Sequence, residues 1–156
     1  MNSVRVISAC DALELMSDPE LFSRIGNDKC TNPKTSITFD DSDVIYGCFN
    51  NGELCGVVTY EPESSVTVNV HCNFIESKRK HAHSLVKLTA RALFREYPTV
   101  SKVNACVPVC YPDVIGFCRK FGLVYEGIDR KSILKGGKLI DRMRLGATRD
   151  EIERLL

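Results

Sequence analysis

The sequence predicts a single α/β domain built around a mixed, mostly antiparallel sheet that is flanked by helices. Its 156 residues fit one domain of ordinary size. Residues 66–74 alternate apolar and polar side chains with a period of two, as a strand does, and the spacing becomes helical after Ser77. Glycine-containing turns at residues 51–52 and 135–137 each separate two strand-like segments, as in hairpins. No linker or repeat divides residues 1–156, so we expect one domain.

The N-terminal part of the chain is expected to hold one short strand and two helices. Val4–Ile7 is a run of strand-forming residues, and residues 10–16 and 19–24 carry apolar side chains at helical spacing. Asp18 stands just before Pro19, which is typical of a helix N-cap followed by its first residue. The polar segment Gly26–Asp43 is expected to be a loop.

Three consecutive strands are predicted in the middle of the chain. Residues 44–49 and 54–60 flank Asn51-Gly52, a pair that favours a two-residue hairpin turn. Such a turn would place Cys48 directly opposite Cys55. The third strand follows at once and presents its apolar side chains on one face: Val66, Val68, Val70, Cys72 and Phe74.

Helices and strands alternate in the C-terminal half of the chain. Helical spacing runs from Ser77 to Tyr97, and Pro98 then ends the helix. A strand, a helix that ends at Gly122 and a hairpin of two strands follow, at residues 100–109, 112–121, 123–134 and 138–145. The pattern Thr148-x-x-Glu151 predicts a capping box at the start of a last short helix.

Charge is distributed unevenly along the chain, although the formal net charge is only +1. Residues 1–76 hold 4 Lys and Arg against 12 Asp and Glu, whereas residues 77–156 hold 17 against 8. The basic half could bind the phosphates of a cofactor or of a nucleic acid, or it could simply pack beside the acidic half. For a nucleic acid, the candidate track is formed by Lys87, Arg91 and Arg95, which recur along one helical stripe.

The cysteines and the hydropathy bear on the cellular compartment. The eight cysteines show no C-x-x-C and no paired Cys/His spacing, so we expect free, mostly buried thiols and no metal site. No apolar run approaches the roughly 18–20 residues of a membrane span, and the N-terminal residues lack the apolar core of a signal peptide. We therefore expect a cytoplasmic protein without a membrane span.

One segment resembles the phosphate-binding motif of a known family. The predicted order of strands and helices resembles the GNAT superfamily of acyl-CoA-dependent N-acyltransferases, in which an Arg/Gln-x-x-Gly-x-Gly/Ala motif opens the long helix. Backbone N–H groups at a helix start can bind anions. The resemblance implies that the residues at this place bind the pyrophosphate of acetyl-CoA: Arg79, Lys80, His81, Ala82, His83 and Ser84. For this basic run, an acidic macromolecular partner or no ligand at all are the alternatives.

A second and longer match lies nearer the C-terminus. Residues 117–130 resemble the family segment F-Y-x-K-x-G-F-x-x-E-G-x-x-R, and residues 135–141 resemble its x-G-x-x-x-D hairpin. The resemblance covers residues 44–146 and implies a sheet that is splayed between the fourth strand, 66–74, and the fifth, 100–109. Splaying would leave backbone groups of Val70, His71 and Cys72 free to bind the pantetheine arm of acetyl-CoA.

The residues that would move protons depart from the family pattern. Where the family often has an Asn and a Tyr on its second helix, this chain has Tyr111 and Cys118. These two are the candidate acids that would protonate the departing CoA thiolate. His71 is the candidate base, because it is the titratable side chain in the middle of the fourth strand. A purely structural His71 is the alternative.

Two functions from different classes follow from the resemblance. As an enzyme, the chain would transfer acetyl from acetyl-CoA to the amine of a small molecule or a protein by direct attack on the thioester. The departures, together with residues 126–132, also resemble GNAT-like proteins of tailed bacteriophages, some of which are head-assembly or DNA-transfer proteins. The chain would then be a virion protein without turnover, with phage structural proteins or DNA as its partners.

Overall fold

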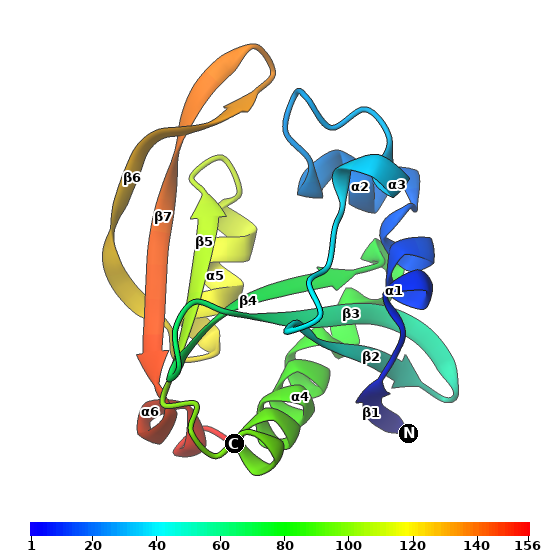
Figure 1. Cartoon of the computed structure of the whole chain (residues 1–156), viewed down its shortest axis with the longest axis vertical. Coiled ribbons are helices and arrows are strands. Elements are labelled where there is room, and N and C mark those ends of the chain that lie inside the picture. Colours follow the sequence, from blue (N-terminus) through cyan, green and yellow to red (C-terminus); the bar gives the residue numbers. More distant parts are fainter.

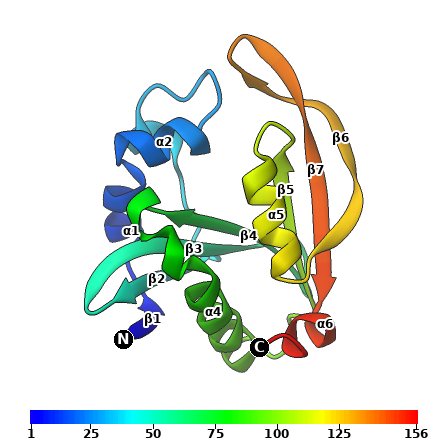
Figure 2. The ribbon, with the colours of Figure 1, turned by 180° about the vertical axis from the view of Figure 1, so that it is seen from behind.

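The computed structural model describes the whole chain, Met1–Leu156, as one sheet with helices packed on it (Figures 1 and 2). The strands are β1 (Asn2–Val6), β2 (Val44–Asn50), β3 (Glu53–Pro62), β4 (Thr67–Phe74), β5 (Lys102–Pro108), β6 (Val124–Lys135) and β7 (Lys138–Thr148). The helices are α1 (Ala9–Met16), α2 (Pro19–Ile25), α3 (Pro33–Ser36), the 3-10 helix η1 (Glu76–His81), α4 (Ala82–Glu96), α5 (Pro112–Lys120) and α6 (Arg149–Glu153).

The seven strands form a single sheet in the order β1-β2-β3-β4-β5-β7-β6. Every neighbouring pair is antiparallel except β4 and β5, which are parallel. The expectation of a mixed, mostly antiparallel sheet flanked by helices is therefore confirmed. No helix of the chain is both long enough and apolar enough to cross a membrane.

Each face of the sheet has its own apolar core. On one face, Val58 and Val68 pack with Leu85 and Leu93 of α4, and all four side chains are buried. On the other face, Val57 packs with helices α1 and α2, whose buried residues include Leu15 and Leu21. Burying a side chain of this size stabilises a fold by about 1.5–3 kcal/mol. These two cores hold the β1–β4 half of the sheet between α4 and the N-terminal helices.

Local sequence signals explain several turns and helix ends. Asn51 and Gly52 both have positive φ, 50° and 84°, as the expected two-residue hairpin turn requires. The Asp18 side chain accepts from backbone N–H groups of α2, and Thr148 with Glu151 forms the predicted capping box.

Two local expectations are wrong. Cys48 lies opposite Gly56 rather than Cys55, because the register shifts between Cys48 and Phe49 in a β-bulge. The Cys55 thiol donates to the Cys48 carbonyl at 3.1 Å instead of facing the other thiol. The segment 26–43 is not a plain loop, because Asn32 accepts from the Lys34 N–H and caps the one-turn helix α3.

The central strands part after a short shared stretch. Strands β4 and β5 pair only from Thr67 to Asn69 and from Lys102 to Asn104, whereas β3 follows β4 as far as Phe74 and β7 follows β5 as far as Pro108. Figure 1 shows the two halves of the sheet diverging from this point. The splay implied by the resemblance is therefore present.

The open end of the splay is bridged by the tip of the β6–β7 hairpin. Backbone N–H groups of Gly136 and Gly137 donate to the Asp28 carboxylate at 2.7 and 2.6 Å. The Lys135 ammonium donates to main-chain carbonyls at the end of α2, the shortest bond being 2.7 Å to Gly26. We call these contacts the clasp; they tie the C-terminal half of the sheet to the segment after α2. In the upper part of Figure 1, the tip of the β6–β7 hairpin lies near this segment.

Candidate functional site

A cleft of about 490 Å³ occupies the splay between β4 and β5. It is enclosed by the two parted strands, helix α5, the end of α2, η1 with the start of α4, and the β6–β7 hairpin. It is lined by Leu21, Arg24, Ile25, Val70, His71, Cys72, Asn73, Phe74, Arg79, Ala82, Ala105, Cys106, Val107, Pro108, Tyr111, Asp113, Val114, Phe117, Cys118, Ile133 and Arg142. Most of these side chains are apolar, so a few polar groups determine what the cleft can orient.

The cleft passes through the sheet from one face to the other. Successive residues of a strand point to opposite faces, and both alternating sets line the cleft. Phe74 and Val107 belong to the α4 face, where they are part of its core, whereas His71 and Cys106 belong to the opposite face. The cleft therefore has two mouths, one beside the start of α4 and one on the face that carries His71.

The first mouth holds part of the predicted phosphate segment. Arg79 and Ala82 line the cleft. Arg79 has a carboxylate, that of Glu76, only at 3.7 Å, so its guanidinium retains unused donors. The Ala82 N–H is bonded to the Arg79 carbonyl, because η1 continues directly into α4.

The other predicted phosphate residues lie outside the cleft lining. Lys80, His81, His83 and Ser84 surround the start of α4. His83 packs edge-on against Phe117, which does line the cleft, with ring centroids 6.4 Å apart. The Ser84 hydroxyl donates to the His81 carbonyl and accepts from the Asn2 amide. The structure thus brings Arg79 and Ala82 to the cleft and leaves the remaining four around its first mouth.

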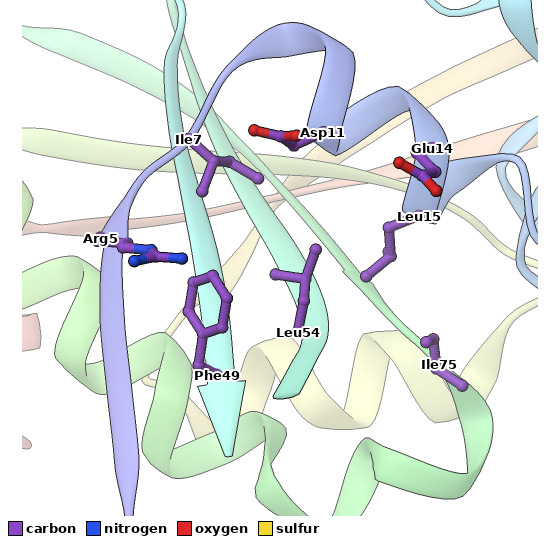
Figure 3. A pocket seen from close by; sticks show the side chains of 8 residues that line it. All are labelled: Arg5, Ile7, Asp11, Glu14, Leu15, Phe49, Leu54 and Ile75. Atoms are coloured by element: carbon purple, nitrogen blue, oxygen red, sulfur yellow. The ribbon is translucent and has the colours of Figure 1, made fainter. Parts of the chain in front are cut away.

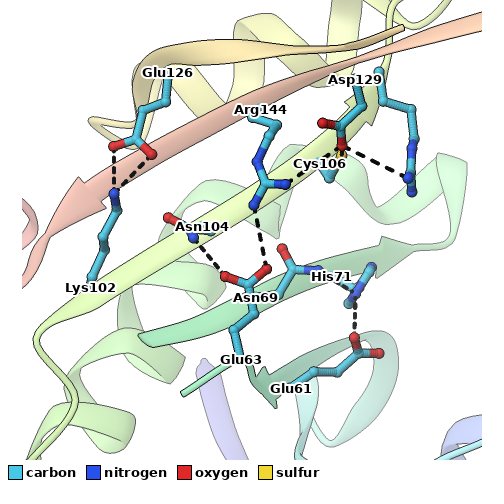
Figure 4. Close-up of polar contacts among 11 residues, drawn as sticks. Glu61, Glu63, Asn69, His71, Lys102, Asn104, Cys106, Glu126, Asp129 and Arg144 are labelled. Carbon is cyan, nitrogen blue, oxygen red and sulfur yellow. Dashed lines mark hydrogen bonds and ion pairs between the residues drawn. The ribbon is translucent and has the colours of Figure 1, made fainter. Parts of the chain in front are cut away.

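The second mouth holds His71 in a hydrogen bond with a residue of the neighbouring strand. His71 Nε2 lies 3.1 Å from a carboxylate oxygen of Glu61, and both side chains are less than half exposed (Figure 4). The hydrogen bond to His71 holds the pKa of the Glu61 carboxyl below its usual value. With Nε2–H donating to Glu61, the other ring nitrogen of a neutral imidazole is free to accept a proton.

The Asn69 amide also reaches this imidazole, at 3.2 Å from Nε2. One nitrogen cannot both donate to Glu61 and accept from an amide N–H. The Asn69 side chain is therefore assigned with its oxygen toward Nε2–H, so that Glu61 and Asn69 share one donor. Both contacts fix the plane of the His71 ring, and Glu61 is a partner that the sequence pattern alone did not identify.

The two candidate acids lie on the cleft wall in different surroundings. Burial raises the pKa of the Cys118 thiol to about 11. The centroid of the Tyr111 ring lies 4.9 Å from the Arg24 guanidinium and 5.1 Å from the Lys135 ammonium, beside the clasp. Its hydroxyl makes no hydrogen bond within the chain, so its O–H remains available as a donor.

Strand β4 supplies the remaining predicted residues, Val70 and Cys72. Both line the cleft beyond the last pair between β4 and β5. The Cys72 side chain is open to the cleft, yet protein atoms surround it closely enough to raise its thiol pKa well above the usual value. All eight cysteines are free thiols, but only Cys48, Cys55 and Cys118 are buried, so the expectation of mostly buried thiols is wrong. No group of three or more His, Cys, Asp or Glu side chains is gathered as a metal site.

A network of charges that the sequence did not predict lies next to the second mouth (Figure 4). Arg144 lies between Glu63 and Asp129, with N···O distances of 3.8 and 3.7 Å, and Arg142 reaches Asp129 at 3.9 Å. The Glu63 carboxylate also accepts from the Asn104 amide at 2.7 Å. These residues come from the turn after β3 and from β5, β6 and β7, so only the folded chain brings them together.

A second pocket, of about 400 Å³, lies beside α1 and the β2–β3 hairpin (Figure 3). Its side chains are Arg5, Ile7, Asp11, Glu14, Leu15, Phe49, Leu54 and Ile75, and the Arg5 guanidinium packs over the Phe49 ring at 4.5 Å. None of the catalytic or cofactor-binding residues predicted from the sequence lines this pocket.

The predicted nucleic-acid track on α4 is engaged by the chain itself. Lys87 and Arg91 donate to main-chain oxygens of Leu155 and Leu156. Arg95 pairs with its neighbour Glu96 at 3.0 Å. Each of the three cations therefore already has a partner, which leaves less of the stripe for DNA phosphates.

Comparisons with known proteins bear on the fold. The chain matches no protein-family model, and a search of curated protein sequences finds no significant match. Among solved structures, a spermidine N-acetyltransferase from Vibrio cholerae in complex with CoA and spermine matches with a TM-score of 0.78 at 13% identity, over 97% of this chain and 98% of that one. A mutant spermidine/spermine N-acetyltransferase from the same organism matches with a TM-score of 0.78 at 14% identity, over 99% of this chain and 97% of that one. The chain therefore has the fold of the GNAT N-acetyltransferases.

Proposed function

We propose that this chain is an acetyl-CoA-dependent N-acetyltransferase that acts by direct transfer. The observation that carries the proposal is the cleft that passes through the sheet, with Arg79 at one mouth and the Glu61–His71 pair at the other. Two substrates that enter from opposite mouths would meet between the parted strands, as direct attack on a thioester requires. Arg79 would bind a phosphate of CoA, and the backbone of Val70, His71 and Cys72 would bind its pantetheine arm.

The reaction needs two proton transfers. An ammonium group first loses one proton to His71, so that the free amine can attack the acetyl carbonyl. The N–C bond forms, the C–S bond of the thioester breaks, an acid of the protein protonates the departing CoA sulfur, and the second nitrogen proton restores that acid. We assign Tyr111 rather than Cys118 as the donor to that sulfur, because the Tyr111 hydroxyl has no hydrogen-bond partner within the chain, whereas the Cys118 side chain is buried.

The similar structures support the choice of cofactor and of acceptor class. The Vibrio cholerae spermidine N-acetyltransferase is seen with CoA and spermine. By this likeness we propose that acetyl-CoA is the acyl donor and that the acceptor is an amine. The free thiols of this chain suit the reducing cytoplasm, where we place the reaction.

Calorimetric titration with acetyl-CoA tests the proposal. We expect saturable binding, and we expect Arg79→Gln to weaken it by about tenfold or more, because a charge-assisted contact to phosphate is lost. Arg95→Gln is the matched control, since Arg95 lies near the far end of α4, outside the cleft, and pairs only with Glu96. Equal affinity of all three proteins would argue against the assigned phosphate contact, and no binding would refute the proposed function.

A transfer assay tests the base. His71→Asn should lower kcat by about a hundredfold or more, as is typical when a general base is lost. Glu61→Gln should lower it less, because the imidazole remains. If the chain binds no acetyl-CoA but binds duplex DNA with a steep salt dependence, the alternative of a virion or DNA-transfer protein is favoured instead.

A further inference from the structure

The charges that line the cleft are not balanced. Three arginines, Arg24, Arg79 and Arg142, stand against one carboxylate, Asp113. Arg24 donates to both oxygens of Asp113, at 2.9 and 2.7 Å, so this pair is satisfied. Arg79 and Arg142 have carboxylates only at 3.7 and 3.9 Å, beyond the 2.7–3.2 Å typical of a direct hydrogen bond. Two arginines of the cleft thus keep unused donors.

These two arginines lie at different mouths. Arg79 stands just before α4, on the side assigned to CoA. Arg142 pairs with Pro108 of β5 and Asp129 of β6 in the sheet register, and directly paired residues point to the same face. Since Leu145 belongs to the core of the α4 face, Arg142 points to the opposite face, which is the face of His71. CoA phosphates could therefore use the free donors of Arg79, but they cannot reach those of Arg142, which lies at the other mouth.

The Arg142 side chain is held in place by one hydrogen bond, while its other N–H donors remain free. Its Nε donates to the Ser132 hydroxyl at 3.0 Å, and Ser132 in turn donates to the Asp129 carbonyl at 2.9 Å. The terminal nitrogens have only the distant Asp129 carboxylate. A guanidinium fixed at Nε and free at its ends matches the two oxygens of a carboxylate.

The opposite side of the same mouth is acidic. Glu61 lies against His71, and Asp43 stands near both; burial, together with the charge of Glu61, raises the pKa of the Asp43 carboxyl. An ammonium group is attracted to this side, and His71 is there to take its proton. The mouth thus presents a negative side toward β3 and a positive side toward β7.

We propose that the acceptor is an amine that also carries a carboxylate, with the carboxylate bound by Arg142 and the amine directed to His71 and Glu61. The inference rests on the proposed acetyl transfer and narrows its acceptor. Spermidine carries only positive charges, and it would leave Arg142 with only the Asp129 carboxylate, at 3.9 Å.

Acetyl transfer to matched acceptors tests this assignment. The acceptors are ω-amino acids of two to six carbons, n-alkylamines of the same lengths, and spermidine. We expect kcat/KM to be about tenfold to a hundredfold higher for the best ω-amino acid than for its alkylamine, because a charge-assisted pair is gained. The preferred chain length then reports the spacing between the amine and carboxylate positions.

Variants separate this role from a structural one. Arg142→Gln should remove the advantage of the ω-amino acid, mainly through KM, so that the ω-amino acid and its alkylamine become similar in kcat/KM. Arg142→Lys should keep part of the advantage because the charge remains. Arg130→Gln, an exposed arginine of β6 outside the cleft, is the matched control. Melting temperatures of all variants confirm that each one is folded.

The outcomes distinguish the two proposals. If acetyl-CoA binds and alkylamines or spermidine are acetylated as well as the ω-amino acids are, the carboxylate assignment is overturned while acetyl transfer stands. An equal loss for both acceptor types in Arg142→Gln overturns it as well. If acetyl-CoA does not bind in calorimetry, the proposed function fails, and the acceptor assignment fails with it.

Discussion

Replacement of Gly56 by alanine tests how tightly β3 and β4 are packed at the cleft. Gly56 lies opposite Phe74 in the sheet, and a Cβ at Gly56 would lie 2.2, 2.4 and 2.7 Å from three carbons of the Phe74 ring. Carbon atoms in contact are normally about 3.5–4.0 Å apart, so the ring must move by more than about 1 Å. Overpacking of this kind costs about 1–3 kcal/mol.

Thermal unfolding measures this cost. For a chain of this length, 1 kcal/mol corresponds to about 2–4 °C, so we expect Gly56→Ala to lower Tm by about 2–12 °C. Phe74→Leu should rescue it, since the smaller side chain removes the clash, and the double variant should lose less than the two single variants together. Gly116→Ala, where a Cβ meets nothing within 4 Å, is the control and should be neutral or stabilising. An unchanged Tm in Gly56→Ala, or no rescue, would refute the packing argument.

Three further predictions concern the clasp, a surface ion pair and the thiols. Asp28→Ala should speed hydrogen exchange at the Gly136 and Gly137 amides, which lose their acceptor; unchanged exchange would contradict the clasp. Arg24 holds the pKa of Asp113 below its usual 3.8, so the pair stabilises the fold at neutral pH and this contribution is lost as the pH falls below about 4. Asp113→Asn should therefore flatten stability against pH in that range, and an unaltered acid profile would count against it. Alkylation followed by mass spectrometry should modify the exposed Cys10 before the buried Cys48, and should reach all eight cysteines after unfolding.

The features that sequence analysis predicted well depend on residues close together in the chain. The Asn51-Gly52 turn requires two neighbouring residues with positive φ, and both are present as expected. The capping box at Thr148 and the N-cap at Asp18 involve residues at most three positions apart. Such interactions are decided by local chemistry, so a pattern of a few letters is sufficient.

The charge pairs of the site could not be predicted in the same way. Glu61 meets His71 because Thr59 pairs with His71 and Glu61 pairs with Asn69, a register that the intervening turn determines. A slip by one residue would send Glu61 to the other face. The clasp joins residues that are even farther apart in the sequence, because Lys135 contacts the carbonyl of Gly26, which lies 109 positions earlier in the chain. No spacing rule connects residues so far apart.

The splay itself links the fold to the proposed chemistry. Strand β4 keeps β3 as its partner to Phe74, and β5 keeps β7 to Pro108, so both strands remain ordered after they part at Asn69 and Asn104. Beyond that point, the inner edges of β4 and β5 have no strand partner, and backbone N–H and C=O groups in a protein interior need one. A pantetheine arm has amide groups of its own and can pair with such an edge as a strand does. The same parting opens both faces of the sheet, so one feature of the backbone supplies the cofactor's hydrogen-bonding edge and the passage through which an amine reaches the thioester.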